Sequence, residues 1–337
     1  MQHVNPPTYG ADPSGLICGY LINADEASTP VDCNTAIEFL DRHDAPGFVW
    51  LHFNLAHTGA MPWLRAHAGL NEAFFETLND GLHSTRIERS EQTLIAVIND
   101  VHFDFAFEPS DIATLWSHVD QRLVITARLQ PLRSVDKLRA AVKNGLALRS
   151  SAELLEHLMR AQADGLVEIV RGVTERVDRI EDQLLADRLD HRRARLGALR
   201  RLLVRLQRLL APEPAALFRL LQHPPEWVSE ADVQALREAS EEFSVVLRDM
   251  TSLQERVKLL QEEIGAQVGE ATNRSLFVLT IVTVLALPIN ILAGLFGMNV
   301  GGVPLADHPR GFWIVIVIVL TFTVIAGWIA FRRRRDN

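Results

Sequence analysis

The chain has 337 residues, more than one domain of ordinary size, and its net charge at neutral pH is −8. Charged residues make up 23% of it and the mean hydropathy is +0.07, averages that combine a charged first part with a nearly uncharged end. Only Cys18 and Cys33 are present, which excludes a disulfide framework and gives no structural zinc spacing. We interpret both as buried thiols.

Residues 1–133 are predicted to form an α/β domain that stays in the cytoplasm, because no basic and apolar secretory signal opens the chain. Asp32 is a plausible N-cap for a helix that runs through Leu40. Strand-like runs alternate with such helical patterns, which favours layers of helix and sheet. The runs cover residues 16–22, 48–53, 94–107 with a break near Asn99 and Asp100, and 121–129, and one or two further helices fall within 61–78.

Charge is distributed unevenly along the chain. Residues 1–120 hold 17 acidic residues against four arginines, a net charge of −13, whereas residues 121–210 hold 19 basic against 11 acidic residues, a net charge of +8. The arginines between Arg188 and Arg208 alternate with leucines at helical spacing, and no aromatic stacking platform accompanies them. This pattern favours a solvated or intersubunit helix face, and no nucleic-acid partner is expected.

Residues 134–228 are predicted to be helical, with a break at Pro212. A stalk helix at 229–274 follows, with Ser229 as its N-cap, and no proline interrupts it before Pro288 in the segment beyond. Apolar residues recur every seven positions from Leu236, which indicates a packing seam. The seam either joins neighbouring subunits or docks on the basic helices before Pro212, and both alternatives are consistent with the sequence.

Two uncharged apolar segments, 275–297 and 311–331, are each long enough to cross a bilayer. Trp313 and Trp328 stand near the ends of the second segment, where interfacial aromatic residues belong. The basic cluster that follows, in the tail 332–337, predicts a cytoplasmic C-terminus, so both termini are expected inside and the loop 298–310 outside. The cluster consists of Arg332, Arg333, Arg334 and Arg335.

Polar and small residues form a stripe on one face of the first span. Thr280, Thr283, Asn290 and Gly294 fall with Leu287 at alternating spacings of three and four. An amide inside a membrane is costly unless it is satisfied, so Asn290 either bonds another helix or lines a wet pathway. Two helices of one chain cannot enclose such a pathway, so a channel requires several subunits.

The loop after the first span begins with Gly297-Met298-Asn299. The chain resembles the CorA-type divalent cation transporters, whose signature is Gly-Met-Asn at this place. A large N-terminal domain, a long helix that enters the first of two C-terminal spans and a terminal basic cluster also match, and residues 272–304 match closely. The continuation to Pro304 is similar to the zinc-transporting subgroup, ZntB.

The resemblance implies a funnel-shaped homopentamer of the inner membrane, an α+β cytoplasmic domain with α/β/α layers above a long-helix stalk, and five first spans that line a pore. Asn299, with Gly297 and Met298, would then hold a hydrated ion through its waters. Asp307 and His308 would lie where the ion enters. The positions inward from the motif would be Gly294, Asn290, Leu287, Thr283, Thr280, Leu276 and Asn273.

The function that the resemblance implies is Zn²⁺ uptake, with Zn²⁺ as cargo and no cofactor. Neither span contains a carboxylate, which makes a proton relay inside the pore difficult, so simple permeation and proton coupling both stay open. The alternatives are a Mg²⁺ or Co²⁺ channel and a membrane-anchored coiled-coil scaffold without a pore. No catalytic motif is present, so we expect no enzyme, and no pair of histidines in the first domain has the spacing of a metal site.

Overall fold

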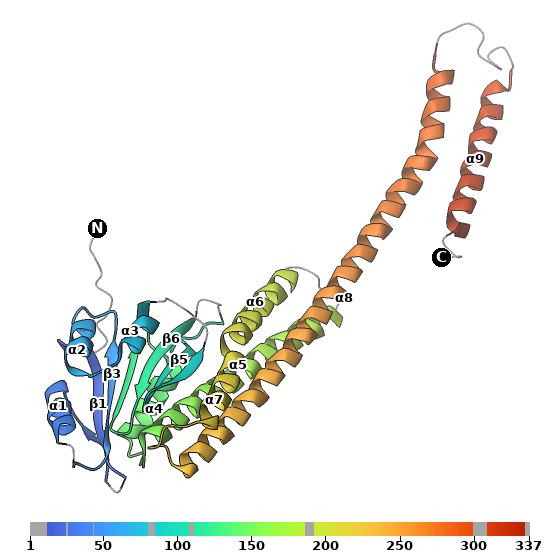
Figure 1. The fold of residues 1–337 in the computed structure, drawn as a ribbon. Helices are drawn as coiled ribbons and strands as arrows, with labels where there is room; N and C mark the ends of the chain where they lie inside the picture. The colour runs from blue at the N-terminus through green and yellow to red at the C-terminus, as the bar shows by residue number, and fades with distance from the viewer. Residues whose placement is uncertain are drawn as a thin grey trace, which may run out of the picture. The chain divides into compact units, whose positions relative to one another are not determined.

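The structure is a computed structural model that describes residues 12–24, 26–42, 44–79, 85–107, 111–185, 192–298 and 309–333. The chain forms two compact units, Met1–Gln261 and Glu262–Asn337. The first unit holds the sheet and most of the helices, and the second holds the apolar end of one long helix and the helix that follows it (Figure 1).

A mixed sheet of seven strands forms the centre of the first unit in the described part of the chain (Figure 1). Neighbouring strands are antiparallel except for the central pair β3 and β7, in which Val49 lies opposite Leu123. The strand order is β2-β1-β3-β7-β6-β5-β4. The strands are β1 (Leu16–Ile22), β2 (Thr29–Pro30), β3 (Phe48–Asn54), β4 (Arg86–Ser90), β5 (Thr93–Val101), β6 (Ile112–Val119) and β7 (Leu123–Arg128).

Helices cover both faces of the sheet, which gives the expected α/β/α layers. One core contains Leu51 and Phe53 of β3 with residues of α1 (Cys33–Asp41), α2 (Ala60–His67) and α3 (Glu72–Asn79). The other contains Trp50 of the same strand with residues of α4 (Arg133–Lys143), α5 (Ser151–Leu185), α7 (Pro212–Gln222) and the start of α8 (Glu230–Phe296). Strand β3 is therefore buried on both faces, as central strands with helices on either side are.

The strand predictions at 16–22 and 48–53 are confirmed, but the prediction for 94–107 was wrong. Strand β5 ends at Val101 and continues through Asn99 and Asp100 without a break, and β6 was not predicted. The two polar side chains remain in a buried strand because they are hydrogen-bonded. Asn99 Nδ2 donates to Thr85 Oγ1 at 3.2 Å, and Asp100 Oδ2 accepts from the backbone N–H of Ser134 at 2.8 Å.

The predicted helix caps are confirmed. The carboxylate of Asp32 accepts from the N–H of Thr35 at 2.8 Å at the start of α1. At the start of α8, Ser229 Oγ accepts from the N–H of Asp232 at 3.1 Å, and Asp232 in turn accepts from the N–H of Ser229. Such reciprocal bonds satisfy amides that a helix leaves unpaired at its N-terminus. Pro212 opens α7 directly after α6 (Arg192–Leu210), where a proline needs no hydrogen-bonded N–H.

The apolar seam of α8 is buried within its own chain, which decides between the two alternatives that the sequence left open. Ion pairs and hydrogen bonds beside the seam identify its neighbours: Arg256 pairs with Asp178 of α5 at 2.7 Å, and Gln207 of α6 donates to Thr251 at 2.8 Å. The seam therefore docks on α5 and α6. Its members, all less than 7% exposed, are Leu236, Ala239, Phe243, Val246, Met250, Leu253, Val257 and Leu260.

A carboxyl group, Glu213, lies fully buried at the first turn of α7. Gln162 of α5 donates to its Oε2 at 3.1 Å and to the carbonyl of Asn99 at 2.6 Å, while Oε1 of Glu213 has no hydrogen-bond partner among the described residues. Burial raises the pKa of Glu213 from 4.5 to about 8, and the neighbouring Asp100 raises it as well. The neutral acid is thus the form that fits this site.

This pKa predicts that the first unit loses stability as the pH rises. A group whose folded pKa is raised stabilises the fold below its ordinary pKa of 4.5, and this contribution is lost as the pH rises through about 8. Between pH 6 and pH 8 we expect a loss of roughly 2 kcal/mol from this group. Glu213→Gln, which stays neutral, is expected to remove that dependence in thermal unfolding of the purified chain.

Glu241→Gln changes an exposed carboxylate of α8 and is the matched control. It should keep the pH dependence of the unmodified protein. Equal slopes for the unmodified protein and Glu213→Gln would contradict the assignment.

Candidate ion pathway

The second unit contains the apolar end of α8 and the helix α9 (Gly311–Arg333). Among the described residues, α8 is the one helix long and apolar enough to cross a membrane, with a most apolar window that has a mean hydropathy of 2.5 and no buried residue. A shorter apolar stretch, Gly311–Ile325, lies in α9, on which the second predicted span falls. Trp313 and Trp328 of α9 are exposed.

The predicted polar stripe lies on uninterrupted helix. Alternating steps of three and four residues bring its members to one face of α8. All of these side chains are exposed in the single chain, and Gly294 has no neighbouring atom within 4 Å of the position that a Cβ would take. The stripe consists of Asn273, Leu276, Thr280, Thr283, Leu287, Asn290 and Gly294.

The stripe offers neutral oxygen atoms. Thr280 Oγ1 donates to the carbonyl of Leu276 at 2.8 Å, and Thr283 Oγ1 donates to that of Leu279 at 2.9 Å. The hydroxyl protons are therefore used within the helix, and the oxygen lone pairs remain outward as acceptors. Asn290 makes no hydrogen bond to any residue in the described part of the chain, so its amide requires a partner from another molecule or from water.

Pro288 lies inside α8, one residue beyond Leu287. Because proline has no N–H, the carbonyl of Val284 lacks the donor that a helix normally supplies from the fourth residue onward. This leaves a further neutral oxygen within the apolar segment, close to the stripe. The helix nevertheless continues to Phe296.

The signature motif begins where α8 ends. The N–H of Gly297 still donates to the carbonyl of Ala293 at 3.0 Å, and a Cβ at this glycine would lie 3.1 Å from that carbonyl oxygen, which is closer than ordinary contact. The side chain of Met298 is 53% exposed. Asn299, Asp307 and His308 lie outside the described residues, as do Arg334 and Arg335, while Arg332 and Arg333 are the last residues of α9.

Of the two cysteines expected to be buried thiols, Cys33 is buried, whereas Cys18 is half-buried. His52 of the first unit lies in a buried hydrogen-bond network. Arg128 Nε donates to His52 Nε2 at 3.0 Å, so His52 carries its proton on Nδ1, which lies 2.8 Å from Thr126 Oγ1. Burial and the charge of Arg128 hold the pKa of His52 well below 6.5. Across the described ranges, no group of three or more His, Cys, Asp or Glu side chains is placed to bind a metal ion. The spacing of strand residues did not reveal this buried network, because its members are 74 and 76 residues apart.

Three comparisons with known proteins agree on one family. A family model described as CorA-like Mg²⁺ transporter protein matches residues 46–334. The divalent cation transporter CmaX of Pseudomonas aeruginosa is 30% identical over 326 residues, 96% of this chain and 97% of that protein. The zinc transport protein ZntB of Yersinia enterocolitica is 23% identical, over 83% and 85% of the two chains. A solved structure of full-length CmaX has a TM-score of 0.79 at 31% identity, covering 96% and 99%.

The chain belongs to the CorA family of divalent cation transporters, the family that the Gly-Met-Asn motif predicted. Membership of a transporter family also agrees with the expectation that the chain is not an enzyme. The CmaX relative shares more identity with this chain than the ZntB relative does.

Pro288 gives a prediction about the backbone of the pathway. Pro288→Ala supplies an N–H to the carbonyl of Val284, so the turn around it should open less often. We expect amide hydrogen exchange in residues 284–292 to slow by about tenfold in detergent-solubilised protein, measured by mass spectrometry. Pro224→Ala, between α7 and α8, should leave this segment unchanged. Unaltered exchange in Pro288→Ala would mean that the turn is already held by other bonds.

Proposed function

We propose that the protein carries Zn²⁺ into the cell through a pore that the stripe of α8 lines. Several copies must surround one axis to enclose such a pore, and five is the number that the family resemblance implies. The observation that carries the proposal is the stripe itself: neutral amide and hydroxyl oxygens with two leucines, on one face of an exposed apolar helix, with no partner for Asn290 in the described chain.

Neutral oxygens suit an ion that keeps its water shell. Small divalent cations lose coordinated water reluctantly, and amide or hydroxyl groups can hydrogen-bond that water without trapping the charge. A ring of Asn299 amides at the outer end would select hydrated ions, and rings of Asn290 and Thr283 would follow inward. Leu287 and Leu276, which are 57% and 54% exposed, would form apolar constrictions that stop ions when they dewet.

The basic residues that end α9 and follow it determine the orientation that we propose. Arg332 to Arg335 lie beside an apolar helix, and such clusters are retained on the cytoplasmic side. An even number of spans then places the N-terminal unit in the cytoplasm and the short loop 298–310 outside. Asp307 and His308 of that loop would meet the ion first, on the outer side of the inner membrane.

Zn²⁺ is proposed as cargo because the loop that follows Gly-Met-Asn resembles ZntB and the chain is 23% identical to a zinc transport protein. Mg²⁺ is the alternative, which the description of the matching family model favours. Neither span contains a carboxylate, so protons coupled to transport would have to move through water or through His308 and Asp307.

Asn290→Leu tests the proposed pathway. In liposomes that contain the purified protein, we expect Zn²⁺ entry to fall at least about tenfold, because a hydrogen bond to a charged or strongly polarised partner contributes about 1.5–3 kcal/mol. Asn299→Ala should have a similar effect. Thr283→Val should also reduce entry, whereas Thr321→Val, which removes the same kind of helix-internal bond from α9, should not.

The same liposomes identify the ion. Zn²⁺ entry that increases with an imposed proton gradient supports coupled zinc uptake, whereas gradient-independent entry that prefers Mg²⁺ would replace zinc by magnesium as the cargo. Absence of entry for every divalent cation would leave only the scaffold.

Leu287→Ala tests the apolar constriction. A smaller side chain widens and wets this ring, so we expect divalent cation entry into the liposomes to rise several-fold. Val278→Ala is the control, because Val278 is similarly exposed but lies nine residues before Leu287, on the opposite face of α8. Equal effects of the two substitutions would mean that Leu287 does not face the ion.

A further inference from the structure

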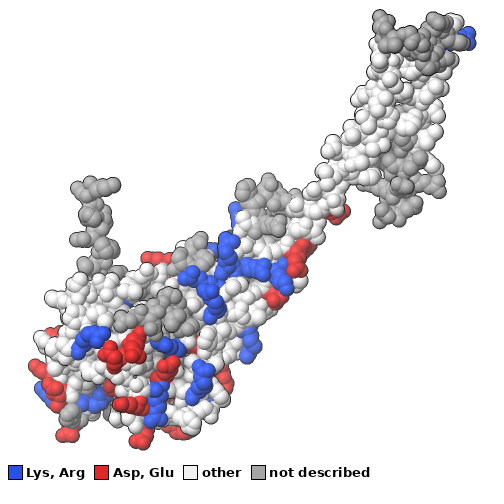
Figure 2. All heavy atoms as spheres, turned by 45° about the horizontal axis from the view of Figure 1, so that its top comes forward, with Lys and Arg blue, Asp and Glu red and all other residues white. Residues whose placement is uncertain are grey.

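The outer face of α6 carries a row of arginines that are not part of the candidate ion pathway. Arg200, Arg201, Arg205 and Arg208 are exposed, while the leucines of the opposite face are buried. Basic side chains gather in the middle of the face shown in Figure 2, over the helical part of the first unit. The helix face that the sequence predicted to be solvated or intersubunit is thus exposed in the single chain.

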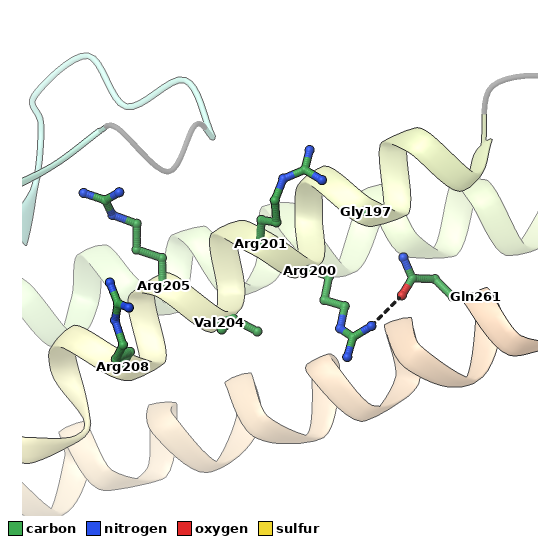
Figure 3. Close-up of a pocket in the computed structure, with 7 residues that line it drawn as sticks. All are labelled: Gly197, Arg200, Arg201, Val204, Arg205, Arg208 and Gln261. Atoms are coloured by element: carbon green, nitrogen blue, oxygen red, sulfur yellow. Dashed lines mark hydrogen bonds between the residues drawn. The ribbon is translucent and has the colours of Figure 1, made fainter.

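The arginines border an open, shallow groove. With Gly197 and Val204 of α6 and Gln261 of α8, they line a volume of about 560 Å³ that is open to solvent (Figure 3). All of the lining residues belong to the first unit, so the groove is a property of that unit alone.

The positive charges in the groove are not neutralised within the described chain. No described carboxylate lies within ion-pair distance of Arg201, Arg205 or Arg208, and Arg200 bonds only to the amide of Gln261. Arginines elsewhere on these helices differ: Arg256, for example, pairs with two acidic residues of α5. The groove therefore attracts an anion from outside the chain.

The polar groups that surround Gly197 are hydrogen-bond donors. Arg200 Nη1 donates to Gln261 Oε1 at 3.2 Å (Figure 3), which occupies the oxygen of that amide and leaves its NH₂ group available. A Cβ at Gly197 would lie 3.6 Å from Arg201 Nη1 and 3.9 Å from Gln261 Nε2. The glycine thus leaves open a position beside two donors, which a phosphoryl oxygen can occupy.

We propose that this groove binds a small molecule with two or more phosphoryl groups, of which a nucleoside triphosphate is the test case. Arg201, Arg205 and Arg208 lie on one helix face and extend over about 10 Å of axis, too far for a single phosphate to bridge. One guanidinium group can donate two parallel hydrogen bonds to phosphoryl oxygens. Val204, 47% exposed among them, offers an apolar contact to the part of the ligand that carries no charge.

Binding of ATP to the purified full-length protein tests the proposal. Calorimetry in the presence of a chelator keeps divalent cations out of the measurement. We expect saturable binding that weakens with salt, and at least a tenfold higher Kd in the double variant Arg201→Gln, Arg205→Gln. Gly197→Ala should also weaken binding, because its methyl group fills the position beside the donors while alanine favours the helix, so unfolding cannot explain the loss.

The matched control is Arg219→Gln with Arg237→Gln, two exposed arginines of α7 and α8 outside the groove. It should bind ATP as the unmodified protein does. Absence of saturable ATP binding, or an equal Kd in the groove and control variants, would overturn the proposal. The protein could instead bind phosphatidylglycerol vesicles through Arg201 and Arg205 and fail to bind ATP. That result would overturn the proposal of a small-molecule ligand and assign the groove to lipid headgroups.

Discussion

Helix α8 carries two opposite kinds of surface on one hydrogen-bonded backbone. Between Leu236 and Leu260 its seam is buried against α5 and α6, whereas from Ser275 to Phe296 most side chains are apolar and none is buried. A soluble protein seldom exposes an apolar surface of this extent, because its contact with water costs about 25 cal/mol per Å². The docked part fixes the helix in the first unit, and the exposed part has the composition of a helix that contacts lipid.

Features with local causes could be predicted from the sequence. The caps at Asp32 and Ser229 depend on bonds to residues three positions away. The long helix was predicted from its periodicity and from the absence of proline before Pro288. Features that depend on distant partners could not. Strand β5 passes through Asn99 because Thr85 and the opposite residue of β6, Thr114, hydrogen-bond to its side chain. The seam of α8 is buried within its own chain because α5 and α6 pack against it.

The candidate pathway, too, could be predicted from the sequence only in part. The spacing of Thr283, Leu287 and Asn290 was sufficient to place them on one face, and the continuous helix agrees with it. Their assignment to a pore depends on other copies of the chain and stays a prediction, as do the roles of Asn299 and His308, which lie outside the described residues. The arginine groove was visible in the sequence only as a basic helix, because its floor at Gln261 comes from a segment 61 residues beyond Arg200.

The seven-residue repeat of the stripe has a geometric consequence. A straight α-helix needs 3.6 residues per turn, so a stripe that repeats every 3.5 drifts by about 20° in each heptad. From Asn273 to Gly294 the stripe spans three heptads, and its two ends are therefore rotated by roughly 60° about the helix axis. Straight parallel helices would turn one end of the stripe away from a shared axis. Helices that keep the whole stripe facing that axis must wind around it with a left-handed twist, so a change in winding would rotate the two ends of the stripe by different amounts.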